Sequence, residues 1–247
     1  MATATTVPRI QTERRFFTGM AIAMALFVFI GFAPTYFLYP VLGTESVRGA
    51  GPLTLMVHLH AAVSSAWMLF LIMQAGLIAG RQHEQHMRNG VIGLGLAIAV
   101  VVIGVVVAIH SGRVGRTPPD WTPAAFLVFP LTSVALFSGF IGAALMWRRR
   151  PDYHKRLILL GTMAILVPAG SRFARYILTG VLPPGPIGGM ILSDLFLAAL
   201  AAYDIRSKGR LHPVTLWGGG LLLLSQPLRL IIGKSDPWTA FATWLIG

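Results

Sequence analysis

Polar and ionisable side chains interrupt long apolar stretches of this sequence, where burying them in lipid is costly. In one stretch His60, Ser64, Trp67 and Gln74 recur at intervals of four, three and seven residues. This spacing places the four side chains on one face of a helix. An imidazole on that face has the chemistry to ligate a metal ion or to hydrogen-bond a cofactor. We therefore predict that these four residues bind a ligand.

Charged residues at a similar depth in three further apolar stretches extend this candidate site. Arg172, Arg175, Asp194 and Arg229 lie about 6–12 Å from the same end of their predicted helices, judged from the helical rise. Three arginines outnumber the one acid, and an unpaired charge at this depth costs several kcal/mol, so we expect a bound anion. The candidates are haem propionates, a carboxylate metabolite and a phosphate head group. The alternative is structural, with long side chains reaching the head groups and Asp194 neutralising Arg172.

Five histidines are candidate ligands for a metal ion, because neutral imidazole suits zinc, copper and haem iron. They are His60 and His110 toward one membrane face, and His86, His154 and His212 toward the other. The second group precedes or begins three helices, among basic residues that favour anions. Its alternative role is a basic rim that binds acidic lipid head groups. The sequence contains no cysteine, which excludes disulfides, thiolate metal sites and covalent c-type haem.

Several membrane-spanning helices must position these residues. The chain is 55% hydrophobic and only 11% charged, whereas soluble domains carry about 25% charged residues. We predict an all-α fold, a polytopic membrane protein of one domain (1–247) with seven transmembrane helices. The expected spans are 16–39, 53–80, 90–110, 123–147, 157–180, 187–205 and 214–233, followed by an interfacial tail at 237–247. Pro34, Pro130, Pro168 and Pro227 interrupt four spans toward one membrane face.

Basic residues are distributed unequally between the predicted loops. The 20 lysines and arginines exceed the 8 acidic residues, giving a net charge of +12, and most of them lie in alternate loops. The positive-inside rule then places the amino terminus inside and the carboxyl terminus outside. This distribution explains the charge without nucleic acid, which we exclude as a partner.

Short motifs add a resemblance to known proteins. The motifs that carry this resemblance begin with the spacing of His60, Trp67 and Gln74. They continue at residues 86–90, 150–157, 209–213 and 225–229. Over most of its length after the first helix, the chain resembles a widespread bacterial family of uncharacterised integral membrane proteins. This resemblance implies a seven-helix, multi-pass protein of the bacterial inner (cytoplasmic) membrane and no particular activity.

A weaker similarity is to cytochrome b561-like bundles, in which histidines on opposite sides of the membrane ligate two b haems. That similarity implies haem b as a cofactor, with His60 and His110 as one ligand pair and His86 and His154 as the other. The sequence departs from the pattern because His110 lies at the rim of its span and His86 and His154 lie at helix starts.

Three functions follow from these observations. The first is a haem- or quinone-associated redox protein, with the arginines holding acidic groups of the cofactor. The second is a transporter or sensor of a small organic anion, because such proteins place charged groups beside broken helices. The third is a non-enzymatic subunit or assembly factor of a larger membrane complex. The expected partners are the lipid bilayer and an anionic lipid or small anionic ligand, and whether the chain is an enzyme stays open.

Overall fold

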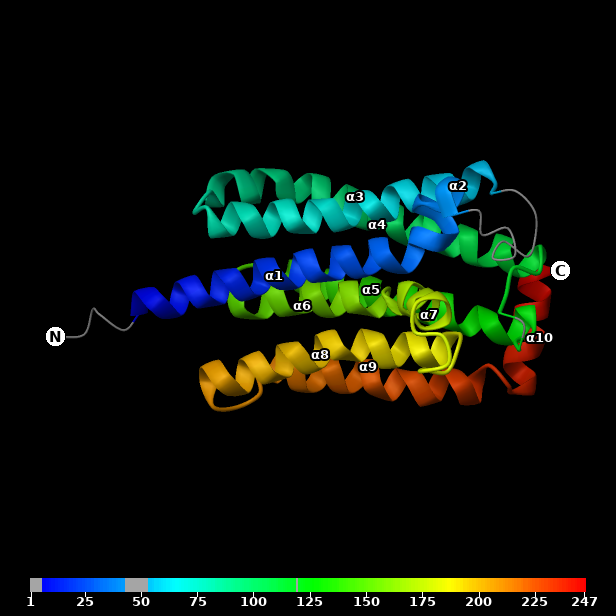
Figure 1. The fold of residues 1–247 in the computed structure, drawn as a ribbon. Coiled ribbons are helices and arrows are strands. Elements are labelled where there is room, and N and C mark those ends of the chain that lie inside the picture. The colour runs from blue at the N-terminus through cyan, green and yellow to red at the C-terminus, as the bar shows by residue number, and fades with distance from the viewer. Residues whose placement is uncertain (1–5, 43–52, 119) are drawn as a thin grey trace.

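Long apolar helices run side by side along the molecule, and Figure 1 shows them in chain order from blue to red. The structure is a computed structural model that describes residues 6–42, 53–118 and 120–247. Its helical elements are α1 (Thr6–Phe32), the π-helix η1 (Ala33–Phe37), α2 (Tyr39–Leu42), α3 (Leu55–Ala79), α4 (His83–Arg113), α5 (Pro123–Met146), α6 (Pro151–Ala164), α7 (Val167–Tyr176), α8 (Pro186–Lys208), α9 (Pro213–Ile232) and α10 (Asp236–Ile246).

Six of the described helices are long and apolar enough to cross a membrane, and the α6–α7 pair makes a seventh span if the two are taken together. The prediction of an all-α polytopic protein is therefore confirmed. In Figure 1, α1 begins at one end of the bundle and α10 lies across the other. Which end faces the cytoplasm stays a prediction.

The predicted fifth span, 157–180, is two helices rather than one. α6 ends at Ala164 and α7 begins at Val167, and the two are bent by 49°. Pro168 explains the position of the break, because a proline ring collides with the carbonyl four residues earlier in a continuous helix. That carbonyl belongs to Ala164, the last residue of α6. Proline also disfavours the helical conformation of the residue before it.

The other helix boundaries differ from the predicted spans mainly in their polar first turns. α1 begins at Thr6 rather than at residue 16, and α4 begins at His83 rather than at residue 90. Hydropathy marks only the part of a helix that suits lipid, so these turns fell outside the predicted spans. Pro34 lies in the π-helix η1, while Pro130 and Pro227 lie inside α5 and α9.

The centre of the bundle is α6, which packs against α5, α8 and α9. Leu160 and Thr162 of α6 are fully buried. The Trp67 indole of α3 donates a hydrogen bond to Thr162 Oγ1 at 3.2 Å and packs edge-on against Phe137 of α5. The buried indole N–H of Trp67 therefore has a hydrogen-bond partner, as buried polar groups require. The two contacts of this side chain hold α3 against α5 and α6.

Two glycines allow α7 and α8 to meet backbone to backbone. A Cβ atom on Gly189 would lie 2.4 Å from the carbonyl oxygen of Val167, and one on Gly170 would lie 2.6 Å from the carbonyl oxygen of Gly189. Small residues permit this close approach between membrane helices. Val167, at the start of α7, is thereby held beside α8.

The predicted tail, 237–247, forms the helix α10 (Asp236–Ile246) in all but its last residue, Gly247. It crosses the end of the bundle and packs on α4 and α5 (Figure 1). The Trp238 indole donates a hydrogen bond to the carbonyl oxygen of Ala124 at 2.9 Å.

Candidate functional site

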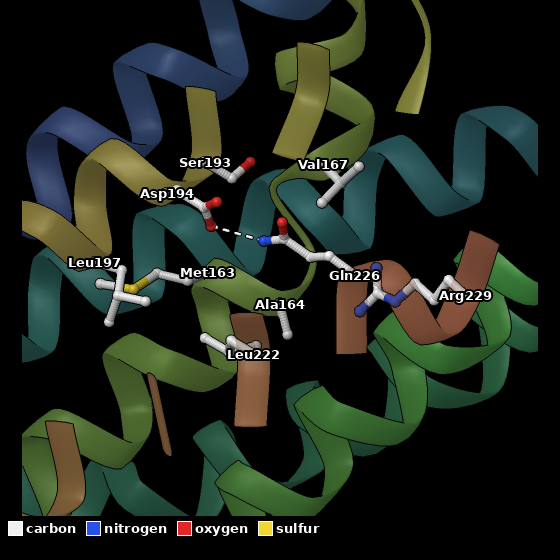
Figure 2. Close-up of a pocket in the computed structure, with 9 residues that line it drawn as sticks. All are labelled: Met163, Ala164, Val167, Ser193, Asp194, Leu197, Leu222, Gln226 and Arg229. Atoms are coloured by element: carbon white, nitrogen blue, oxygen red, sulfur yellow. Dashed lines mark hydrogen bonds between the residues drawn. The ribbon is translucent and has the colours of Figure 1, made fainter. Parts of the chain in front are cut away.

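A small cavity, lined by apolar side chains together with a few polar ones, lies where the broken fifth span meets α8 and α9. Its volume is about 20 Å³, which is enough for about one water molecule. It is lined by residues of α6, α7, α8 and α9, and Figure 2 shows their side chains: Met163, Ala164, Val167, Ser193, Asp194, Leu197, Leu222, Gln226 and Arg229. Three of its polar residues, Asp194, Gln226 and Arg229, carry the chemistry.

Asp194 and Gln226 join α8 to α9 across the cavity. The Gln226 side-chain amide donates to Asp194 Oδ1 at 2.8 Å, as the dashed line in Figure 2 marks. Asp194 is half-buried. Gln226 directly precedes Pro227 in α9, so the amide lies beside a proline inside the helix. The sequence had suggested that Asp194 neutralises Arg172, whereas its hydrogen-bond partner is this neutral amide.

Arg229 is buried with neutral partners. Its side chain is 3% exposed. Its Nη1 donates to Ser133 Oγ of α5 and its Nη2 to Ser225 Oγ of α9, both at 3.3 Å. Its Nε is buried without a hydrogen-bond partner among the described residues. In the described part of the chain, none of the ion pairs within 4.0 Å involves Arg229. Its guanidinium therefore contacts no carboxylate there.

The start of α7 adds a second positive element. Val167, the first residue of this ten-residue helix, lines the cavity. The amino end of a helix carries a partial positive charge. In α7 the N–H groups of Ala169 and Gly170 already donate to the carbonyl oxygen of Leu166, so the contribution is that of the helix dipole. The cavity therefore has a guanidinium and a helix amino end on its wall, with one half-buried carboxylate facing them.

The other predicted ligand-binding residues lie outside this cavity. Arg172 donates to the carbonyl oxygen of Pro168 at 3.0 Å, and its guanidinium lies 4.4 Å from the centroid of the Phe32 ring. Arg175 is exposed. His60 is half-buried and close enough to Arg172 for their charges to interact. The predicted site residues thus form two groups. Asp194 and Arg229 line the cavity, whereas Arg172 and His60 lie outside it.

The polar face predicted on the second span is mostly packed into the core. Trp67 and Gln74 are buried, whereas His60 and Ser64 are half-buried. The Trp67 hydrogen bond to Thr162 gives this tryptophan a structural role. The Oε1 atom of Gln74 is buried and has no hydrogen-bond partner among the described residues.

Two of the candidate metal ligands, His86 and His154, lie near each other. The rings of His86 and His154 are 6.4 Å apart between centroids, and His154 Nδ1 lies 2.8 Å from the carbonyl oxygen of Ala144. His110 lies in the last turn of α4. His212 contacts the carboxylate of Asp152. Within residues 6–42, 53–118 and 120–247, no group of three or more histidines and carboxylates is placed to hold a metal ion.

A buried ion pair that the sequence analysis missed joins α6, α8 and α9. Arg156 and Asp204 are both fully buried and form a bidentate pair. Asp204 also accepts hydrogen bonds from the Thr215 hydroxyl and from the backbone N–H of His212. Both oxygens of this carboxylate thereby accept hydrogen bonds, as a stable buried charge requires.

Asp152 and His212 extend the same junction toward the bundle end. His212 Nε2 lies 3.1 Å from the Asp152 carboxylate, and His212 Nδ1 accepts the N–H of Val214, which caps α9. This pairing gives His212 a capping role at the start of α9. Burial lowers the pKa of His212, although the contact with Asp152 opposes the shift.

Comparison with known proteins gives no match, whether to family models, to curated proteins or to solved structures. The predicted resemblance to a bacterial membrane family is therefore untested, and the site must be judged from its own geometry.

The cavity beside Arg229 is too small to hold a haem. Ligand pockets for groups of this size have volumes of about 300–1,000 Å³. The cavity at Asp194 and Arg229 measures about 20 Å³. The two predicted inner haem ligands, His86 and His154, lie near the starts of α4 and α6 and do not line the cavity. We derive no chemistry through a haem for this protein.

Proposed function

We propose that this chain is a multi-pass protein of the bacterial inner membrane that binds a small anion beside Arg229 and transports or senses it. The observation that supports this most is the buried guanidinium of Arg229, whose described partners are two serine hydroxyls and which borders a cavity. A buried charge without a counter-ion is costly, and an anion would neutralise it.

The broken fifth span supports the same proposal. Transporters use discontinuous helices whose amino ends point at anionic groups near the middle of the membrane. α7 begins at the cavity, and it follows a break in a membrane-spanning pair of helices. The basic end of the bundle, where α3 meets α4 and α5 meets α6, is the proposed cytoplasmic end.

The size of the cavity defines the ligand class. About 20 Å³ accommodates a water molecule or a monatomic anion, and it accommodates a carboxylate group only if the helices separate. We therefore propose chloride or a short monocarboxylate as the ligand, rather than a quinone or haem propionate. The hypothesis of a subunit of a larger complex has no specific support in the cavity.

Thermal unfolding of the detergent-purified chain in sodium salts tests the proposal. Chloride, nitrate, formate and acetate are compared with gluconate at equal ionic strength. A ligand at 100 times its Kd stabilises by about 2.7 kcal/mol. For a chain of this size that raises Tm by about 5–11 °C. Anion-dependent shifts are expected in the native protein and in Arg175→Gln, which changes an exposed arginine.

Arg229→Gln should abolish the shift, and Asp194→Asn should strengthen anion binding several-fold, because it removes the negative charge from the cavity wall. The opposite directions of the two variants distinguish a binding site from a general effect of mutation. No anion-dependent shift in the native protein contradicts the proposal. If binding is found, uptake of radioactive anion into proteoliposomes separates a transporter from a sensor.

A further inference from the structure

A large apolar groove lies on the bundle surface between α5 and α9. Its volume is about 510 Å³, within the range of ligand-binding sites. α5 contributes Ala135, Gly139 and Ala143 to the lining, and α9 contributes Trp217 and Leu221. No atom lies within 4 Å of the position that a Cβ would take on Gly139. Small side chains on α5 therefore leave the space open.

One end of the groove carries aromatic and basic residues. Trp147 and Tyr153 line this end, where α5 finishes and α6 begins. Arg148, Arg149 and Arg150 follow Trp147 directly and are all exposed. The Arg150 guanidinium lies 5.6 Å from the centroid of the Tyr153 ring. Three exposed cationic residues thus follow the groove-lining Trp147 in the chain, and one of them lies over Tyr153 at this end of the groove.

The backbone adds positive charge at the same end. Tyr153 lies in the first turn of α6, and Pro213 and Val214, at the start of α9, also line the groove. Helix amino ends favour anions. The nearby acid, Asp152, is paired with His212 at 3.1 Å. Three arginines and two helix starts therefore face one acid that already has a partner.

We propose that this groove binds a diacyl phospholipid with a net negative head group, with one acyl chain in the groove and the phosphate at Arg148–Arg150. Apolar lining suits the chain, aromatic residues suit the head-group level, and clustered arginines attract anionic lipid. A second copy of the protein fits less well, because its own arginine-rich end would lie beside this one. The groove shares no lining residue with the cavity at Arg229, so this inference is independent of the proposed function.

Native mass spectrometry of the detergent-purified full chain tests this assignment. The probes are phosphatidylglycerol and phosphatidylcholine with identical acyl chains. The native protein should retain phosphatidylglycerol about tenfold more than phosphatidylcholine, a ratio that corresponds to about 1.4 kcal/mol. Equal retention of the two lipids would overturn the head-group assignment.

Gly139→Leu places a side chain in the groove and should abolish retention of both lipids. Its matched control is Gly142→Leu, because Gly142 lies on the same helix, outside the groove lining, and also has no atom within 4 Å of a Cβ position. Retention by Gly139→Leu equal to that of the control would overturn the groove as the binding place. A native dimer that Gly139→Leu converts to a monomer would instead assign the groove to a second copy.

Replacing Arg148, Arg149 and Arg150 together by glutamine should lower phosphatidylglycerol retention to the level of phosphatidylcholine. Arg206→Gln is the charge control, since Arg206 is exposed near the end of α8, on a helix that does not line the groove. If the triple variant keeps the native preference, the arginines do not hold the head group and the proposal fails.

Discussion

Asp204→Asn removes the negative charge that neutralises Arg156 at the buried junction of α6, α8 and α9. Both side chains are fully buried. The carboxylate receives the guanidinium from α6, the Thr215 hydroxyl from α9 and the backbone N–H of His212. Asparagine keeps the shape and one acceptor oxygen, so the change isolates the loss of charge from the loss of packing.

The expected loss is large because the guanidinium remains buried. Breaking a buried ion pair by removing one partner costs about 3–5 kcal/mol. At about 2–4 °C per kcal/mol for a chain of this size, Tm should fall by about 6–20 °C. The double variant Arg156→Met with Asp204→Leu should recover most of this loss, because apolar replacement of a buried pair is often neutral or stabilising.

Tryptophan fluorescence of the detergent-purified protein during heating measures these shifts. Asp120→Asn is the control, since Asp120 is exposed and surface changes stay within about 0.5 kcal/mol. If Asp204→Asn melts together with Asp120→Asn, charge does not hold the junction of α6, α8 and α9. A double variant no more stable than Asp204→Asn would show that the packing of the replaced side chains, rather than charge, dominates.

Two further predictions concern the helix contacts. Gly189→Ala places a methyl group 2.4 Å from the Val167 carbonyl oxygen, and this overpacking should cost about 1–3 kcal/mol in thermal unfolding, whereas Gly220→Ala, which meets no atom within 4 Å, should not. Equal melting of the two variants would contradict the close contact of α7 and α8. Burial lowers the pKa of His212 in the folded state, so the unfolded chain binds more protons and stability should decline as pH falls below about 6.5. The decline in Tm between pH 7 and pH 5 should be smaller in His212→Asn, and an unchanged pH dependence would refute the capping role.

Hydropathy predicted the helices well because lipid imposes a simple requirement on each span. It did not locate the break after Ala164, although Pro168 was recognised as an interruption. The bend needs the proline collision and also a neighbour that holds the second half in its new direction. That neighbour is α8, through Gly170 and Gly189, and a contact between distant residues is not visible in one span.

The site was predicted in part. Asp194 and Arg229 share a cavity, as their similar distances from the helix ends suggested. Such a distance does not say toward which side of its helix a side chain points. Arg172 therefore lies against Phe32, outside the cavity. Arg156 directly precedes the predicted span 157–180, so it was assigned to a basic loop, and its pairing with Asp204 was not predicted. The signal was available, since Asp204 is an acid near the end of a span, where few acids occur.

The close contact of α7 and α8 constrains how the protein can change shape. Two backbones in direct contact resist sliding past each other, so Val167 and Asp194 are held together on one side of the cavity. Gln226 and Arg229 lie on α9, and the Gln226–Asp194 hydrogen bond joins the two sides. The room beside Arg229 therefore depends on how α7 and α8 lie against α9, and not only on the size of the side chains that line the cavity.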